Sequence, residues 1–249
     1  MNLIWALTLS TFSGVIIGSM GAGGSILLVP ILIYLLQMPV KTAMGVSLLT
    51  IALTSLVASI AHQRQKNVCW QLAIPWATTG MVAAYLGSRL AQYFTSNSLL
   101  LIFSLVVIIS ALSLIKKPTV IDQQLTAHRA NYPLRTILPI SSLIGILTGL
   151  IGVGGGFLLV PTLVHLKLPI KLAIGTSLVI ISLQSAVGFL GYASHTEFSL
   201  SILTTVAVAN MAGSLLGIEL NRHLSSQQLK TAFVFLILAV GLFTLFSSL

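Results

Sequence analysis

Two runs of glycine form the pattern in this sequence that is best suited to binding chemistry. Residues 21–24 read Gly-Ala-Gly-Gly and residues 152–156 read Gly-Val-Gly-Gly-Gly, and each run stands directly before a short apolar segment. If that segment is a helix, its first N–H groups have no partner within the helix and lie at the positive end of the helix dipole. Together with the glycine amides, these groups would form a site for an anion that needs no buried cation.

The two glycine runs belong to a longer internal repeat. The stretch GVIIGSMGAGGSILLVP at 14–30 returns as GILTGLIGVGGGFLLVP at 145–161, and PVKTAMGVSL at 39–48 returns as PIKLAIGTSL at 169–178. The offset between copies is 131 residues for the first pair and 130 for the second. A repeat of this length predicts that one structural unit occurs twice in the fold.

The repeat divides the chain into two halves and a joint. We expect a first transmembrane repeat over residues 1–115 and a second over residues 136–249. The stretch between them, 116–135, is the longest hydrophilic run in the sequence and is interpreted as a linker. Two readings remain open at this point, a transporter built on the repeat and a duplicated bundle with a purely structural role.

The composition is that of a protein embedded in lipid. Hydrophobic residues make up 56% of the 249 positions and charged residues only 6%, with a mean hydropathy of +1.06. A soluble domain carries about 25% charged residues. Because long apolar stretches recur, we expect an all-α, polytopic membrane protein. The net charge of +9 does not indicate nucleic-acid binding, because the sequence has no basic helix or aromatic-basic platform.

Each half divides into five helical segments, of which the second is short. That segment has about 11–13 residues, which gives roughly 16–20 Å of helix against ~30 Å of hydrocarbon. We therefore expect each half to contain a glycine-broken helical hairpin, with its tip inside the membrane, and three spanning helices. The segments are 3–20, 25–37, 42–61, 69–91 and 97–115 in the first half, and 136–151, 157–167, 172–193, 199–220 and 228–248 in the second.

The basic residues distinguish between two arrangements of the hairpins. If the first two segments of each half formed one continuous span, the basic residues would divide about evenly between the membrane faces, against the positive-inside rule. If those segments enter and return, the halves have inverted topology and ten of the twelve basic residues share one face. That face carries Arg64, Lys66, Lys116, Lys117, Arg129, Arg135, Lys167, Lys171, Arg222 and Lys230, and the other carries Lys41 and Arg89.

The charge distribution therefore favours two inverted-topology repeats. It places the linker 116–135 in the cytoplasm and both termini outside the cell. Inverted repeats with broken helices and a binding site near the membrane midplane are typical of secondary transporters.

Polar residues of the following helices extend the candidate site. Ser47, Thr50, Thr54 and Ser55 correspond to Ser177, Ile180, Gln184 and Ser185 in the other copy, at spacings that share a helical face. The alternatives are that the glycines only allow close helix packing and that the polar side chains hydrogen-bond between helices. The expected substrate-binding residues are Gly21, Gly23, Gly24, Ser25, Ser47, Thr50, Gly152, Gly154, Gly155, Gly156, Ser177, Gln184 and Asn210.

Lys41 and Lys171 are counterparts in the repeat, and the inversion puts them at opposite membrane surfaces. There they could form the two mouths of an anion path and raise the local anion concentration. The alternative is that each is a basic residue that snorkels at a helix start. Arg89 and Glu219 are also counterparts, and both are expected near helix ends.

Enzymatic and metal-dependent chemistry has little support in the sequence. The single Cys69 excludes an internal disulfide and a cysteine-based metal cluster. The five histidines show no metal-ligand spacing, and with only three acidic residues they form no catalytic set. We therefore expect no catalytic residues, no metal and no cofactor, and a passive anion channel stays open as the rival to a carrier.

The doubled pairing of a glycine-rich run ending in LLVP with PxKxAxGxS resembles the TauE/SafE family of sulfite exporter-like permeases, and the resemblance covers nearly the whole chain. It implies a multi-pass protein of the bacterial inner membrane. The implied function is alternating-access transport of a small anion such as sulfite or an organosulfonate. The expected partners are that anion and the lipid bilayer, with no nucleic acid, and a homodimer is left open. A passive anion channel or a non-transport structural membrane protein is the alternative.

Overall fold

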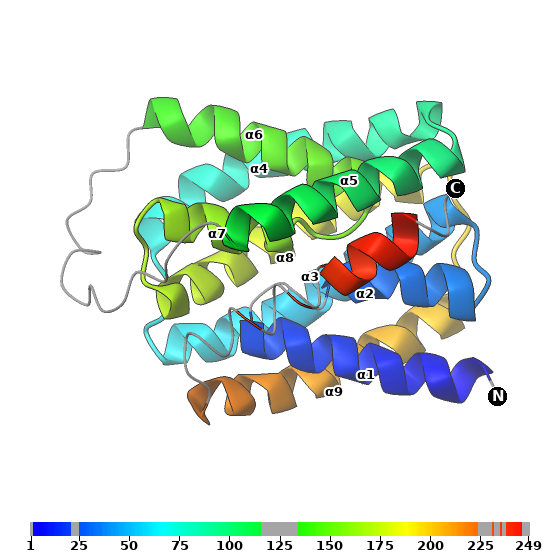
Figure 1. The fold of residues 1–249 in the computed structure, drawn as a ribbon, viewed down its shortest axis with the longest axis horizontal. Coiled ribbons are helices and arrows are strands. Elements are labelled where there is room, and N and C mark those ends of the chain that lie inside the picture. Colours follow the sequence, from blue (N-terminus) through cyan, green and yellow to red (C-terminus); the bar gives the residue numbers. More distant parts are fainter. Residues whose placement is uncertain are drawn as a thin grey trace.

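The structure, a computed structural model, describes residues 2–20, 25–115, 134–223, 231, 235 and 238–245. Within these residues all regular secondary structure is helical. The long helices lie roughly along one axis, and they run both ways along it (Figure 1). The elements are α1 (Asn2–Met20), α2 (Ser25–Pro30), the π-helical turn η1 (Ile31–Leu35), α3 (Val40–Arg64), α4 (Trp70–Leu90), the 3-10 turn η2 (Ala91–Tyr93), α5 (Ser96–Ile115), α6 (Leu134–Ile151), α7 (Gly156–His165), α8 (Ile170–Ala193) and α9 (Leu200–His223).

The predicted segments match these helices to within three residues at each end, except the last. α3 continues through His62, Gln63 and Arg64, where the apolar pattern has already stopped. α6 begins at Leu134, two residues before the predicted start of this helix at residue 136. The rest of the linker and most of the segment 228–248 lie outside the described residues.

Six long helices pack side by side in the order α1, α9, α3, α8, α4 and α6. α3 and α8 hold the central positions, and 72% of the most apolar stretch of each is buried by other parts of the protein. Among the described residues, three helices are long and apolar enough to cross a membrane, namely α3, α8 and the Leu200–Leu220 part of α9. The short helices α2 and α7 pack against this row, on α3 and α8 respectively.

Glycines bring the outer helix pairs into backbone contact. A Cβ on Gly18 of α1 would overlap the backbone oxygen of Ser214 in α9. A Cβ on Gly149 of α6 would overlap the backbone oxygen of Ala84 in α4. The second contact is the repeat counterpart of the first, so α1 lies on α9 as α6 lies on α4. Such close approach of small residues is the usual way in which helices associate in lipid.

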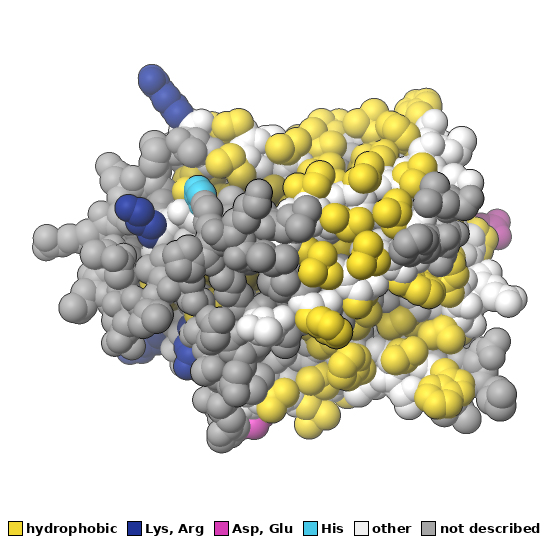
Figure 2. Space-filling view, viewed as in Figure 1, with side chains coloured by type: hydrophobic (Ala, Val, Ile, Leu, Met, Phe, Trp, Pro, Cys, Tyr) yellow, Lys and Arg dark blue, Asp and Glu magenta, His cyan; other side chains and the backbone are white. Residues whose placement is uncertain are grey.

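The two ends of the bundle differ in charge. Figure 2 shows the Lys and Arg side chains gathered at the end where α6 starts, while apolar side chains cover the middle of the visible face. Of the described basic side chains, Arg64, Lys66, Arg135, Lys167 and Lys171 lie at the turns of that end, and Lys41 and Arg89 lie where α3 begins and α4 ends.

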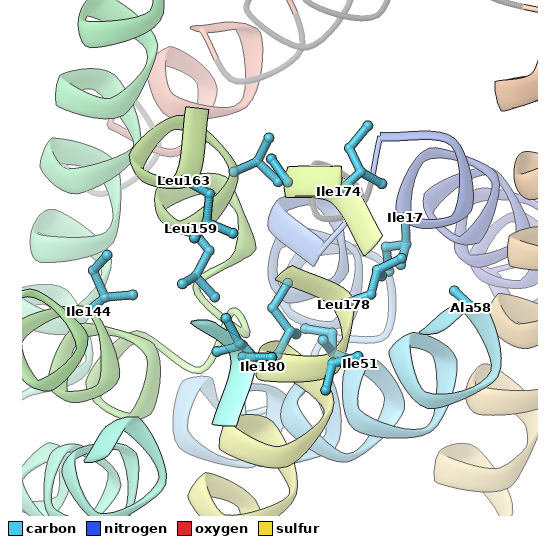
Figure 3. Close-up of a cluster of buried hydrophobic side chains, with 14 of the residues drawn as sticks. Ile17, Ile51, Ala58, Ile144, Leu159, Leu163, Ile174, Leu178 and Ile180 are labelled. Atoms are coloured by element: carbon cyan, nitrogen blue, oxygen red, sulfur yellow. The ribbon is translucent and has the colours of Figure 1, made fainter. Parts of the chain in front are cut away.

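A central apolar cluster holds the short helix α7 in place. Figure 3 shows Leu159 and Leu163 of α7 next to Ile174, Leu178 and Ile180 of α8, with side chains of α1, α3 and α6 completing the cluster. Because lipid is as apolar as these side chains, their contribution comes from close packing more than from removal of water. A helix of ten residues is thus positioned by tertiary contacts.

We predict that Gly149→Ala destabilises the protein. The added methyl group would force α6 away from the backbone of α4, and overpacking of this kind costs about 1–3 kcal/mol. Gly188→Ala in α8 is the matched control, because its Cβ would lie 3.4 Å from Leu48 Cδ1, an ordinary contact. Thermal unfolding in detergent should show a lower midpoint for the first variant and an unchanged or slightly higher one for the second. Equal midpoints would contradict the proposed backbone contact.

Candidate functional site

The chain reverses direction between α6 and α7 through residues 152–155. Gly152 and Gly155 have φ angles of 74° and 62°, in the left-handed region that side chains with a Cβ rarely adopt. A Cβ on Gly152 would also overlap Met44 of α3, and one on Gly155 would overlap the hydroxyl of Thr148. The bend therefore needs glycine at both positions, for conformation and for space.

The tip of the bend lies between the two central helices. A Cβ built on Gly154 would lie 2.7 Å from Ile51 Cγ2 of α3, 3.3 Å from Ile181 Cγ2 of α8 and 3.1 Å from Ser185 Oγ of α8. All three neighbours lie near the middle of their helices, which span Val40–Arg64 and Ile170–Ala193. The bend thus ends deep in the bundle.

The first turn of α7 leaves backbone donors at this bend. Leu158 and Leu159 both donate their N–H groups to the oxygen of Gly155, at 3.0 Å each. The N–H groups of Gly156 and Phe157 come before these hydrogen bonds and have no partner within the helix, as at any helix N-terminus. The positive end of the α7 dipole therefore faces the middle of the bundle.

Polar side chains without hydrogen-bond partners surround the same region. Within the described part of the chain, buried hydroxyl or amide atoms without a partner occur on α1, α3, η2, α6, α8 and α9, and α3, α6 and α8 are the helices that border the bend. A buried polar group left unpaired costs about 1–3 kcal/mol, so such groups cluster where a ligand or water completes the site. We call the following residues the polar cluster: Ser47, Thr50, Thr54 and Ser55 on α3, Thr148 on α6, and Gln184 and Ser185 on α8.

Gln184 brings the largest polar side chain into the cluster. It is fully buried, and neither its amide oxygen nor its amide nitrogen has a partner among the described residues. A Cβ on Gly80 of α4 would overlap the Gln184 amide, so Gly80 provides the space in which the amide lies. In the repeat, Gln184 corresponds to Thr54, and Gly80 corresponds to Asn210. The two copies therefore place their amide side chains on different helices.

Several predicted site residues meet in this region. Ser47, Thr50 and Gln184 belong to the polar cluster, and Gly152, Gly154 and Gly155 form the bend. Gly156 is the first residue of α7, where the sequence had placed the helix start at residue 157. The left-handed residue Gly155 serves as the helix cap and lets the helix begin one residue earlier.

Two other predicted residues bond within or between helices. The hydroxyl of Ser177 donates to the Ile174 oxygen of its own helix, at 2.8 Å. The Asn210 amide nitrogen donates to the Ser10 oxygen at 2.9 Å and to Ser13 Oγ at 3.3 Å, and so joins α9 to α1. The Asn210 contacts agree with the interhelical hydrogen bonding that the sequence left open as an alternative, whereas the Ser177 bond stays within its own helix.

The remaining predicted residues lie at the first glycine run and at the ends of the bundle. Gly21, Gly23 and Gly24 lie outside the described residues, and Ser25 is the buried first residue of α2. Lys171 is exposed near the start of α8. Lys41, near the start of α3, donates a hydrogen bond from Nζ to the Gln92 oxygen at 2.8 Å.

Thr148 is the member of the polar cluster that the sequence analysis missed. Its counterpart in the first copy is Ile17, so the repeat gives no signal for it. A hydroxyl located four residues before Gly152 was the available clue, because that spacing is one helical turn from the bend. Among the described His, Cys, Asp and Glu side chains, no group of three could hold a metal ion.

Comparison with known proteins agrees with this architecture. Residues 6–244 match the family described as "Sulfite exporter TauE/SafE". A "Probable membrane transporter protein" of Xylella fastidiosa is 31% identical over 245 residues, which cover 94% of this chain and 92% of the relative. The "Probable membrane transporter protein YdhB" of Bacillus subtilis is 28% identical, with 94% and 96% covered. No solved structure matches the chain.

The family and the names of these relatives indicate a membrane transporter and not an enzyme. The apolar helices of the structure agree with a multi-pass membrane protein. Because the family match extends over nearly the whole chain, this protein belongs to the sulfite exporter TauE/SafE family.

Proposed function

We propose that this protein is a secondary transporter that moves a small anion, such as sulfite or an organosulfonate, by alternating access. The observation that carries the proposal is the polar cluster, seven buried side chains with unpartnered polar atoms, of which Ser185 lies beside Gly154 and Thr148 lies beside Gly155 at the start of α7. An anion that accepts hydrogen bonds from these groups would satisfy them without a buried cation.

The chemistry of the polar cluster favours an anion over a cation. Hydroxyl groups can donate or accept, but the backbone N–H groups at the bend can only donate. No carboxylate belongs to the polar cluster, so among the described residues nothing there would neutralise a cation. The α7 dipole adds a positive potential at the same point, and this potential is stronger in a region that excludes water.

Reciprocal contacts support a two-fold relation between the copies, and the opposite directions of α1 and α6 support its being an inverted repeat. Gly18 contacts Ser214, and their repeat counterparts Gly149 and Ala84 make the same contact. The central helix α3 likewise contacts its own counterpart, α8. In Figure 1, α1 starts at the end marked N, whereas α6 starts at the opposite end. Two copies that run in opposite directions about one shared site could rock to expose it to either side.

The buried position of the site favours a carrier over a channel. The polar members on α3 and α8, including Thr54 and Gln184, are fully or almost fully buried. Two surface pockets lie near the ends of α3, and neither is lined by a member of the polar cluster. A continuous anion channel would need an open path through this region, whereas an occluded state is one that a carrier passes through.

We predict that Gly154→Asp abolishes transport and that Gly154→Asn does not. Both side chains intrude on Ile51 and Ser185 and both carry an acceptor oxygen, but only the carboxylate adds a negative charge, which the α7 dipole attracts and which repels the anion. For Asn we expect apparent affinity to fall about tenfold, equivalent to about 1.4 kcal/mol. Uptake of labelled sulfite or methanesulfonate into proteoliposomes measures both variants.

Thermal stability in detergent is the control, since both variants must unfold near the same temperature for the comparison to hold. Equal uptake by the Asp variant and the unmodified protein would rule out the bend as the binding site. If both variants fold but neither takes up the anion, the size of the side chain at position 154, and not its charge, prevents transport.

We further predict the orientation of the bundle from the charge difference between its ends. The end with Arg64 and Lys66 should face the cytoplasm of the bacterial inner membrane, and the end with Lys41 should face outside. In a Cys69→Ser background, a membrane-impermeant maleimide should label Tyr93→Cys in intact cells. Lys66→Cys should react only after the membrane is permeabilised, and the reverse labelling would overturn this topology.

A further inference from the structure

A second pocket lies away from the bend, at the end of the bundle where α3 begins and α8 ends. It has a volume of about 230 Å³ and is lined by Lys41, Gln92, Tyr192, His195 and Thr196. We call it the terminal pocket. None of its lining residues belongs to the polar cluster, so it is a separate feature that the proposed transport site does not explain.

One cationic side chain, Lys41, lines the terminal pocket, and a second, Arg89, lies beside the lining residue His195. Lys41 bonds the Gln92 oxygen with one of its three N–H groups, which holds the ammonium group at the pocket and leaves two donors for a ligand. Arg89 donates to Ser194 Oγ at 3.0 Å and also contacts the ring of His195. These are the Lys and Arg side chains at this end among the described residues, and no carboxylate lines the pocket.

A neutral donor is also left unused at the terminal pocket. The amide nitrogen of Gln92 is buried and has no partner within the described part of the chain. Its two N–H groups can only donate, so an acceptor is required to satisfy them. A small oxyanion would supply this acceptor and would also balance the charge of Lys41.

Tyr192 separates the terminal pocket from the bend. Its side chain is 2% exposed, and its hydroxyl donates to the Leu150 oxygen at 3.0 Å and lies 3.5 Å from the sulfur of Met44. Leu150 is in the last turn of α6, and Met44 is the residue that a Cβ on Gly152 would overlap. Tyr192 thus lies between the terminal pocket, which it lines, and two residues next to the bend.

We propose that the terminal pocket is a second anion-binding site, in which a small oxyanion such as a sulfonate binds before it passes Tyr192 to reach the bend. The transport step of this inference rests on the proposed function, whereas the binding step does not. Lys41 and Arg89 attract the anion electrostatically, and Gln92 donates to one of its oxygens. Tyr192 must leave the Leu150 oxygen for the anion to move on.

The binding step can be tested by protection from chemical labelling. The reporter is Thr196→Cys in a Cys69→Ser background, in proteoliposomes of phosphatidylcholine. Methanesulfonate, a fixed monoanion, should slow its reaction with an impermeant maleimide at least threefold. Tyr93→Cys, which lies at the same end and is 86% exposed, should react at an unchanged rate. Protection that is absent, or equal at both positions, would overturn the proposal.

The same labelling separates the terminal pocket from the bend. Protection of Thr196→Cys should persist when Gly154→Asp is added, and it should be lost with Lys41→Gln or with Gln92→Ala. Protection that disappears with Gly154→Asp would mean that the anion binds at the bend only. If labelling slows when phosphatidylglycerol replaces phosphatidylcholine and not with methanesulfonate, the pocket holds a lipid headgroup and the proposal fails.

Transport kinetics give a second and independent measurement. Lys41→Gln should raise the KM for anion added on the side of the terminal pocket about five- to tenfold, with little change in kcat, since it removes a charge that is used before translocation. Lys66→Gln, an equal charge change beyond the other end of α3, is the matched control and should leave KM unchanged. A loss of kcat at constant KM in Lys41→Gln would contradict an access site.

Discussion

A bent backbone in the middle of the bundle is the constraint on which this structure depends. In hydrocarbon every backbone polar group needs a partner, so non-helical backbone at membrane depth survives only where protein encloses it or where it lines a cavity. The bend at 152–155 meets this condition because α3 and α8 close over it and α6 leads into it. Long, apolar central helices are therefore a requirement of the bend as much as a means of crossing the membrane.

The two copies of the repeat differ at several positions of the polar cluster and near the bundle ends. Gln184 and Thr54 are counterparts, and Gly80 leaves room for the larger of the two. His62 and Tyr192 are counterparts as well, and each approaches a backbone oxygen near the end of the neighbouring hairpin helix, His62 at Gly18 and Tyr192 at Leu150. A small anion has no two-fold symmetry of its own to match, so such differences can tune the site without disturbing the helix packing.

The sequence predicted the helices well because their signals are local and repeated. The apolar lengths and glycine runs occur in both copies, and they predicted the helix boundaries to within three residues for every segment but the last, most of which lies outside the described residues. The surroundings of polar groups were harder to predict, because they depend on contacts between distant segments. Ser47 and Ser177 look equivalent in the repeat, yet only Ser177 bonds within its own helix. The terminal pocket combines residues that lie about 150 positions apart in the chain, and no repeat or spacing brings Gln92 to His195.

The separation of charge from the centre of the bundle has a mechanistic consequence in the proposed transport cycle. A Lys or Arg beside the bend would bind an anion tightly, but a tightly held anion leaves slowly, and a buried cation without its ligand is costly. Neutral donors avoid both problems, because hydroxyl and amide groups lose less when the site is empty. The cations Lys41 and Arg89 instead lie at the surface, where water screens them and where they can still concentrate anions. Attraction and release are thereby assigned to different places along one path, and a carrier needs both to complete a cycle.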